Sequence, residues 1–436
     1  MDNLTIGFSG IGLVLVLLAV RVPIAVALAT VSIGGIWILR GSGAALGTLG
    51  SLPYDFASNC TLSAVPMFLL MGAVAYHTGL TGSLYDAARL WLNRLPGGLA
   101  VASNFASAGF AAASGSSVAT AAAMGRLAIP EMLKANYDKA LATGTIAASG
   151  TLGALIPPSI AFVIYGWFTE QPVGKLLMAG FLPGVLTAVI YAVMIIWRCT
   201  LNPKLAPRIT EHVPMEAKIA ALKEVWPLPL LVVCVMGSIY GGVATPTEAG
   251  ALGATFALII GAIKQNLNRE TFVKSFVEAL RTVSAVFLVA IGAILLTRFL
   301  AMAGVPRFMG EIVQQFEASA LTVVLCMTVI YLILGCFLDP LGLMLLTLPI
   351  FLPAFKVLHI DLIWIGVLVV KLIEIGLLTP PVGLNAYVVK GVVGDAVALT
   401  TIFRGLLWFL ACEVVIMTLL IAFPEISLWL PNALSD

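Results

Sequence analysis

The sequence predicts an all-α polytopic membrane protein, and two observations carry that prediction. Hydrophobic residues make up 61% of the chain and charged residues only 10%, whereas charged residues are about a quarter of a typical soluble domain. Apolar runs of about 20 residues, the length that spans a bilayer as a helix, recur between residues 4 and 423. The first run, residues 4–20, has no basic segment before it, so we expect a membrane span there rather than a cleaved signal peptide.

The distribution of basic residues predicts the orientation of the spans. Cytoplasmic loops of membrane proteins are enriched in Lys and Arg. The basic clusters are Arg89/Arg94, Arg126/Lys134/Lys139, the loop 198–225 and the segment 264–281. Placing these clusters in the cytoplasm puts the N-terminus outside.

The first half of the chain contains two interrupted apolar segments. Residues 98–126 lie between two basic clusters that both favour the cytoplasm, consist mainly of Ala, Gly and Ser, and carry a turn signal at 114–117. They predict a re-entrant helical hairpin with a polar tip. Residues 140–166 contain Gly153 and the pair Pro157-Pro158, which predict a broken helix because proline lacks the N–H of a helical hydrogen bond.

The second half repeats this order of segments. Residues 318–355, with Gly335, Asp339 and Pro340 near the centre, predict a second hairpin, and residues 362–389, with Gly376 and Pro380-Pro381, predict a second broken helix. A single constant offset in numbering superposes Gly153 on Gly376 and the first proline pair on the second. We therefore expect two inverted repeats, residues 1–200 and 226–436, joined by a cytoplasmic loop at 201–225. We also expect about ten full spans, and a helix at 271–283 that lies along the membrane interface. Inverted repeats with interrupted segments are typical of secondary transporters.

The interruptions predict ion sites. A broken helix exposes carbonyl oxygens on one side, which suit a dehydrated Na⁺, and N–H groups on the other, which suit an anion. Lys371 and Glu374, one helical turn apart, are either a pair that steers substrate or ion, or a neutralising structural pair. Asp339 either faces a cation site or caps the adjoining half-helix.

Other classes of function find no support in the sequence. His77, His212 and His359 are far apart, and no H-E-x-x-H or C-x-x-C motif is present, so neither a metal centre nor a catalytic set is indicated. We expect no enzyme activity, no cofactor other than Na⁺ as coupling ion, and no nucleic-acid partner.

Four motifs carry a resemblance to a known family. They are "ASGSSVATAAAMG" (113–125), "TLGALIPPS" (151–159), "GGVATPTEAGALGA" (241–254) and "EIGLLTPPVGLNAYV" (374–388). Together they resemble the large membrane subunit of tripartite ATP-independent periplasmic (TRAP) transporters over essentially the whole chain. The resemblance implies an elevator-type, sodium-coupled importer of organic acid anions in the bacterial inner membrane, with a small four-span membrane subunit and a periplasmic solute-binding protein as partners. The alternative is a standalone Na⁺-coupled dicarboxylate or other anion transporter of the same superfamily.

The resemblance also implies site residues. The sodium-site residues would be Ser114, Ser116, Gly153, Ile156 and Pro158 at the first hairpin tip and break, and Gly335, Gly376, Thr379 and Val382 at the second. The substrate-site residues would be Ser117, Thr120, Asp339, Pro381 and Asn385, although Asn385, just past the second break, is either a substrate contact or a packing residue. The sequence departs from the family pattern at Ser58-Asn59-Cys60 and at Thr120, where a negative charge is usual.

Overall fold

The computed structural model describes residues 2–207 and 214–434, and these residues fold into helices joined by short turns, with no strand among them. The all-α membrane fold class is therefore confirmed. In the first half the helices are α1 (Asn3–Ala19), α2 (Ile24–Arg40), α3 (Ser42–Ala57), η1 (Cys60–Ser63), α4 (Ala64–His77), α5 (Leu80–Leu92), α6 (Gly98–Ser114), α7 (Ser117–Lys134), α8 (Lys139–Gly150), α9 (Leu152–Leu155), α10 (Ile160–Thr169) and α11 (Val173–Leu201). In the second half they are η2 (Pro203–Leu205), α12 (Met215–Val225), α13 (Pro227–Tyr240), α14 (Pro246–Ile263), α15 (Arg269–Ala303), α16 (Val305–Gln315), α17 (Ala320–Gly335), α18 (Pro340–Val357), α19 (Leu362–Gly376), α20 (Leu384–Val393), η3 (Gly394–Ala396), α21 (Leu399–Ala422) and α22 (Glu425–Ala433).

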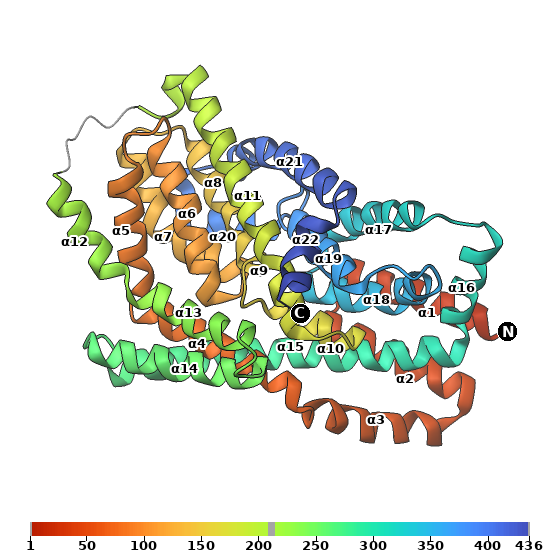
Figure 1. The fold of residues 1–436 in the computed structure, drawn as a ribbon. Helices are drawn as coiled ribbons and strands as arrows, with labels where there is room; N and C mark the ends of the chain where they lie inside the picture. The colour runs from red at the N-terminus through yellow and green to blue at the C-terminus, as the bar shows by residue number, and fades with distance from the viewer. Residues whose placement is uncertain (1, 208–213, 435–436) are drawn as a thin grey trace.

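The helices form two parts that pack against each other. One part, which we call the α15 layer, comprises α2, α3, α4, α14 and α15 and runs along the lower edge of the view in Figure 1. The other, which we call the hairpin body, comprises α6–α10 and α17–α21 and lies above this layer (Figure 1). Helices α4 and α15 of the layer contact α6, α10 and α18 of the hairpin body.

The helix bounds recur along the chain at the predicted offset. The shift in numbering that places Gly153 on Gly376 also places α7 on α18 at both ends, and the start of α8 on the start of α19. The same shift relates α2 to α14 and α5 to α16, with small differences at the ends. Each half thus carries the same order of helices, while the opposite orientation of the two halves stays a prediction.

Three local expectations differ from the structure. The segment 271–283 is not a separate interface helix but the first part of α15, which runs for 35 residues without a proline and with a single glycine, Gly292, that does not interrupt it. The connecting loop 201–225 contains a helix, α12. Among the described residues, six helices, or up to eight if each bent pair is one span, are long and apolar enough to cross a membrane, fewer than the ten expected. The apolar helices α1, α2 and α17 fall short because they have only 17, 17 and 16 residues.

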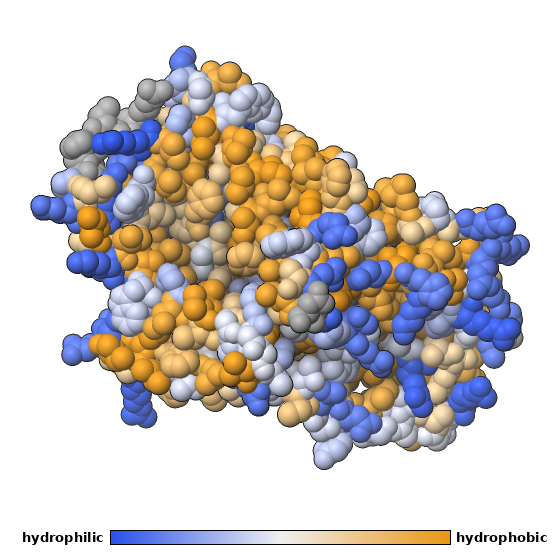
Figure 2. All heavy atoms as spheres, in the orientation of Figure 1, coloured by the Kyte–Doolittle hydropathy of each residue, from blue (hydrophilic) through white to orange (hydrophobic). Residues whose placement is uncertain are grey.

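The surface matches a chain that sits in lipid. Large apolar side chains are exposed along several helices, among them Val193, Val233 and Ile263. On the face in Figure 2, hydrophobic residues cover the middle, and hydrophilic residues gather toward the two ends that carry α12 and α16 in Figure 1. An apolar band between two polar ends is the arrangement that a bilayer favours.

Candidate functional site

The first hairpin turns between α6 and α7 and its tip lies against the first broken helix. Gly115 occupies the turn with φ +60°, a conformation that glycine adopts without a steric cost. A Cβ on Gly115 would lie 2.7 Å from the Pro158 carbonyl oxygen, and a Cβ on Gly153 would lie 2.6 Å from the carbonyl oxygen of Ser116. The two glycines thus allow the backbones of tip and break to touch.

The polar groups of this tip bond to one another. The hydroxyl of Thr120 donates to the Ser116 carbonyl at 2.8 Å and lies 2.8 Å from the hydroxyl of Ser114. The side chain of Ser116 caps α7 by accepting a hydrogen bond from the Ala119 N–H. Thr120, predicted as a substrate residue, is therefore engaged inside the tip.

The break itself leaves backbone oxygens without protein donors. Helix α9 ends at Leu155, Ile156 has extended backbone, and Ser159 caps α10, so the helix bends by 41° at this point. Among the described residues no N–H or O–H donates to the carbonyl oxygens of Ile156 and Pro158. The structure therefore brings the five residues predicted for the first sodium site to one junction, the tip–break contact that we call the first junction.

The second hairpin and second broken helix meet in a related way. A Cβ on Gly376 would lie 2.8 Å from the Cα of Gly335 and 2.9 Å from its carbonyl oxygen. The loop 377–383 follows, where the Thr379 hydroxyl donates to the Ile375 carbonyl at 2.7 Å. We call the contact of Gly335 with Gly376, together with this loop, the second junction.

The two junctions differ in exposure. Gly153, Ile156 and Pro158 are buried, whereas Pro381 is exposed and Val382 retains 37% of its accessible surface. Both proline pairs, at 157–158 and 380–381, have cis peptide bonds. The loop at the second break is thus open on one side in this conformation, whereas the first break is enclosed.

Asp339 stands at the N-terminus of α18 and caps it. Its carboxylate accepts a hydrogen bond from the Gly342 N–H at 3.0 Å. Asp339 was expected either to face a cation site or to cap the adjoining half-helix, and in the structure it caps the helix. Ser116 caps α7 at the position that corresponds to Asp339 in the first half.

Residues from both halves meet between the junctions. The Ser117 hydroxyl, at the start of α7, donates to the Glu374 carboxylate at 2.5 Å, and Glu374 is only 2% exposed. The Asn385 side-chain amide on α20 donates to the Ala147 carbonyl on α8 at 3.1 Å, while its own carbonyl oxygen is buried without a partner among the described residues. Ser117 and Asn385, two of the predicted substrate residues, thus line a polar contact between the halves.

The expected pairing of Lys371 with Glu374 is wrong. The Lys371 ammonium is fully buried and lies 2.7 Å from the carboxylate of Glu413 on α21, and it donates to the Thr187 hydroxyl on α11 at 3.1 Å. The Tyr191 hydroxyl, also on α11, donates to the same carboxylate. A buried charge needs a partner and hydrogen bonds, and here both come from helices distant in sequence, so spacing along one helix is misleading.

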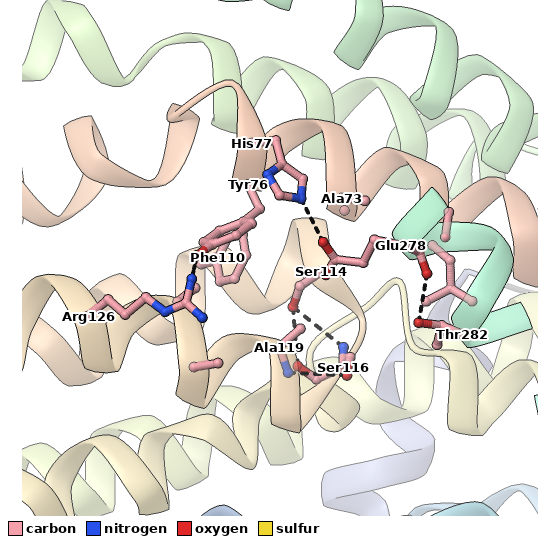
Figure 3. A pocket seen from close by; sticks show the side chains of 15 residues that line it. Ala73, Tyr76, His77, Phe110, Ser114, Ser116, Ala119, Arg126, Glu278 and Thr282 are labelled. Carbon is pink, nitrogen blue, oxygen red and sulfur yellow. Dashed lines mark hydrogen bonds and ion pairs between the residues drawn. The ribbon is translucent and has the colours of Figure 1, made fainter. Parts of the chain in front are cut away.

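A cavity of about 350 Å³ opens beside the first hairpin, between α4, α15 and α7 (Figure 3). Its polar lining includes Tyr76, His77, Ser116, Arg126 and Glu278. His77 Nε2 lies 2.6 Å from the Glu278 carboxylate, and Arg126 donates to the Tyr76 hydroxyl at 2.8 Å. Because Ser116 belongs to the hairpin tip, the tip side of the first junction borders this cavity.

Sequence reasoning missed Glu413 and Tyr191, and it gave no binding role to the cavity residues Tyr76, His77 and Glu278. A signal existed for Glu413, since it is the only acidic residue in the apolar helix α21. Arg126 was interpreted only as an indicator of orientation. Within the described part of the chain, no three His, Cys, Asp or Glu side chains lie close enough to hold a metal ion.

Comparisons with known proteins cover nearly all of the chain. The family model described as "Tripartite ATP-independent periplasmic transporter, DctM component" matches residues 11–426. The chain is 35% identical over 401 residues, 92% of each chain, to the C4-dicarboxylate TRAP transporter large permease protein DctM of Pseudomonas aeruginosa. It is 32% identical to the sialic acid TRAP transporter large permease protein SiaM of Vibrio cholerae, over 86% of this chain and 87% of that one. Among solved structures, the YdaH transporter of Alcanivorax borkumensis matches with a TM-score of 0.58 at 14% identity, over 89% of this chain and 90% of that one.

Proposed function

The chain belongs to the TRAP transporter family, as a DctM-type large permease and so a secondary transporter of organic acids rather than an enzyme, and we propose that it couples import of an organic acid anion to Na⁺. The ions would bind at the two junctions. The anion would be a carboxylate, as the names of the C4-dicarboxylate and sialic acid relatives suggest.

One observation carries the sodium proposal. At the first junction two glycines let tip and break approach, and the carbonyl oxygens of Ile156 and Pro158 have no donor among the described residues. A polar backbone group without a partner is costly at membrane depth. Neutral oxygens on a fixed backbone suit a hard, dehydrated cation such as Na⁺, and no titratable side chain stands among the five residues of that site.

Transport would follow an elevator-type alternating access. The hairpin body would move against the α15 layer and carry both junctions between the two membrane faces. The recurrence of helix bounds at a constant offset and the division into two packed parts support this proposal. Inverted repeats about a central site are a recurrent basis of alternating access.

The partners are proposed from the family. DctM-type permeases work with other subunits, so we expect a small four-span membrane subunit and a periplasmic binding protein that delivers the anion. The N-terminus would lie in the periplasm and the chain in the bacterial inner membrane. The rival proposal is a chain that transports a dicarboxylate alone.

Reconstitution tests both proposals. Proteoliposomes containing the chain, the small subunit and a loaded binding protein should take up the anion when Na⁺ is high outside, and should not when an equal proton gradient replaces it. Uptake by the chain alone would favour the standalone rival. Equal uptake on a proton gradient without Na⁺ would contradict the sodium proposal.

A further inference from the structure

The cavity beside the first hairpin has an uncompensated cation at its edge. Helix α7 carries Glu131 and Lys134 beyond the cavity. The Glu131 carboxylate forms ion pairs with the Arg89 guanidinium at 3.2 Å and with the Lys134 ammonium at 3.4 Å. Arg126 has no such acid. Its one hydrogen-bond acceptor among the described residues is the neutral hydroxyl of Tyr76.

Besides Arg126 and Tyr76, the two ionisable side chains that line the cavity pair with each other. Glu278, on α15, is bound by the His77 ring on α4 at 2.6 Å, and this pair lies on the opposite side of the cavity from Arg126 in Figure 3. A guanidinium has five N–H donors in a planar fork that matches a carboxylate. With one donor used by Tyr76, Arg126 keeps donors for a ligand.

Helix α7 leads from the tip to this arginine along one face. Ala119, Ala122, Ala123 and Arg126 all line the cavity, and their spacing of three and four residues places them in one stripe. The alanine side chains of this stripe are small, so they leave room for a ligand. At 1.5 Å per residue, the Cα of Arg126 lies about 15 Å from that of Ser116 along the helix, so the arginine and the tip offer a ligand two separate groups in one cavity.

We propose that the cavity is an anion-binding vestibule, in which Arg126 binds the carboxylate of the transported anion at a station separate from the hairpin tip. Tyr76 holds the guanidinium at the cavity when no anion is present. This inference rests on the proposed function for the identity of the anion. It adds a second binding point to the substrate path, and it assigns Arg126, otherwise an indicator of orientation, to binding.

A chemical probe tests the vestibule without turnover. In a full-length chain whose six cysteines are replaced by alanine, Ala122→Cys places a thiol one turn from Arg126, about 6 Å away. The thiol is treated with an anionic methanethiosulfonate (sulfonatoethyl) and a cationic one (trimethylammonioethyl). The ratio of the two rates reports the local charge, because any effect of Arg126 on ionisation of the thiol is common to both reagents.

We expect the anionic-to-cationic rate ratio to fall about 3- to 10-fold in Arg126→Gln, for one charge at this distance in water at physiological salt. Arg126→Lys should keep the ratio, and this variant also controls for folding. Lys134→Gln, a change at a 76% exposed side chain three turns from the thiol, should leave it unchanged. Succinate should slow the labelling in the parent and not in Arg126→Gln, and the neutral diamide of succinate should slow neither.

Three results would overturn the proposal. They are a ratio unmoved by Arg126→Gln, equal protection by succinate with and without the arginine, and a thiol that neither reagent reaches from either side. These results are separable from failure of the sodium proposal, because labelling needs no Na⁺ gradient. Loss of Na⁺-driven uptake with intact succinate protection would count against the coupling and in favour of the vestibule.

Discussion

Substitution of Gly153 by alanine tests the first junction directly. The added Cβ would lie 2.6 Å from the Ser116 carbonyl oxygen, and 2.7 Å from both the Ser116 carbonyl carbon and the Thr120 hydroxyl oxygen. Ordinary contact begins near 3.4 Å, so tip and break must separate by about 0.8 Å. Overpacking of this kind costs about 1–3 kcal/mol. If that cost appears at the ion site, Na⁺ affinity falls about 5- to 150-fold.

The assay is the Na⁺ dependence of anion uptake in proteoliposomes. We expect Gly153→Ala to raise the Na⁺ concentration for half-maximal uptake by that factor while protein yield is kept. Gly391→Ala is the matched control, since Gly391 lies on α20 and a Cβ there meets nothing within 4 Å. A wild-type Na⁺ dependence in Gly153→Ala would refute the assignment of the ion to this junction.

Three further perturbations test other parts of the structure. Thr379→Val removes one oxygen from the second junction and should raise the Na⁺ concentration for half-maximal uptake about 10- to 100-fold, since a hydrogen-bond-like contact to a charge contributes about 1.5–3 kcal/mol. An unchanged Na⁺ concentration for half-maximal uptake would argue against Thr379 as a ligand. Lys371→Met leaves the buried Glu413 carboxylate without its cation and should destabilise the chain by about 3–5 kcal/mol in thermal unfolding. The double variant Lys371→Met with Glu413→Leu should recover much of that loss. A double variant as unstable as the single one would contradict the pairing. Single cysteines at Arg94 and Lys134 in a cysteine-free chain should both be labelled only from the cytoplasm, and labelling from opposite faces makes 98–126 a true span.

The interruptions were predictable because their causes are local. Proline cannot continue a helix, and the breaks fall at Pro157-Pro158 and Pro380-Pro381 as expected. The hairpin tips also follow from short-range chemistry, since Ser116 and Asp339 have side chains that cap helices. The hairpins themselves extend farther than predicted, to Lys134 and Val357, because the polar residues near their ends are compatible with helix.

The contacts between distant helices were not predictable in the same way. Lys371 and Glu374 are one turn apart, yet each bonds to a residue elsewhere in the chain, Glu413 and Ser117. The turn spacing limits which side chains share a face of α19, but it does not say which helices cover that face. Only the packing of α7 and α21 against α19 decides the partners.

The unequal exposure of the two junctions bears on how the transporter works. A transporter that alternates access must not open both sides of its central site together. Here the break at Gly153 is covered by its hairpin, whereas Val382 in the loop after the second break is 37% exposed. If the two halves are inverted, an enclosed first break and an open second break differ in solvent access within one conformation. We therefore expect the reverse conformation to expose Ile156 and bury Val382, and solvent accessibility of cysteines at these two positions should change in opposite directions when Na⁺ and anion are added.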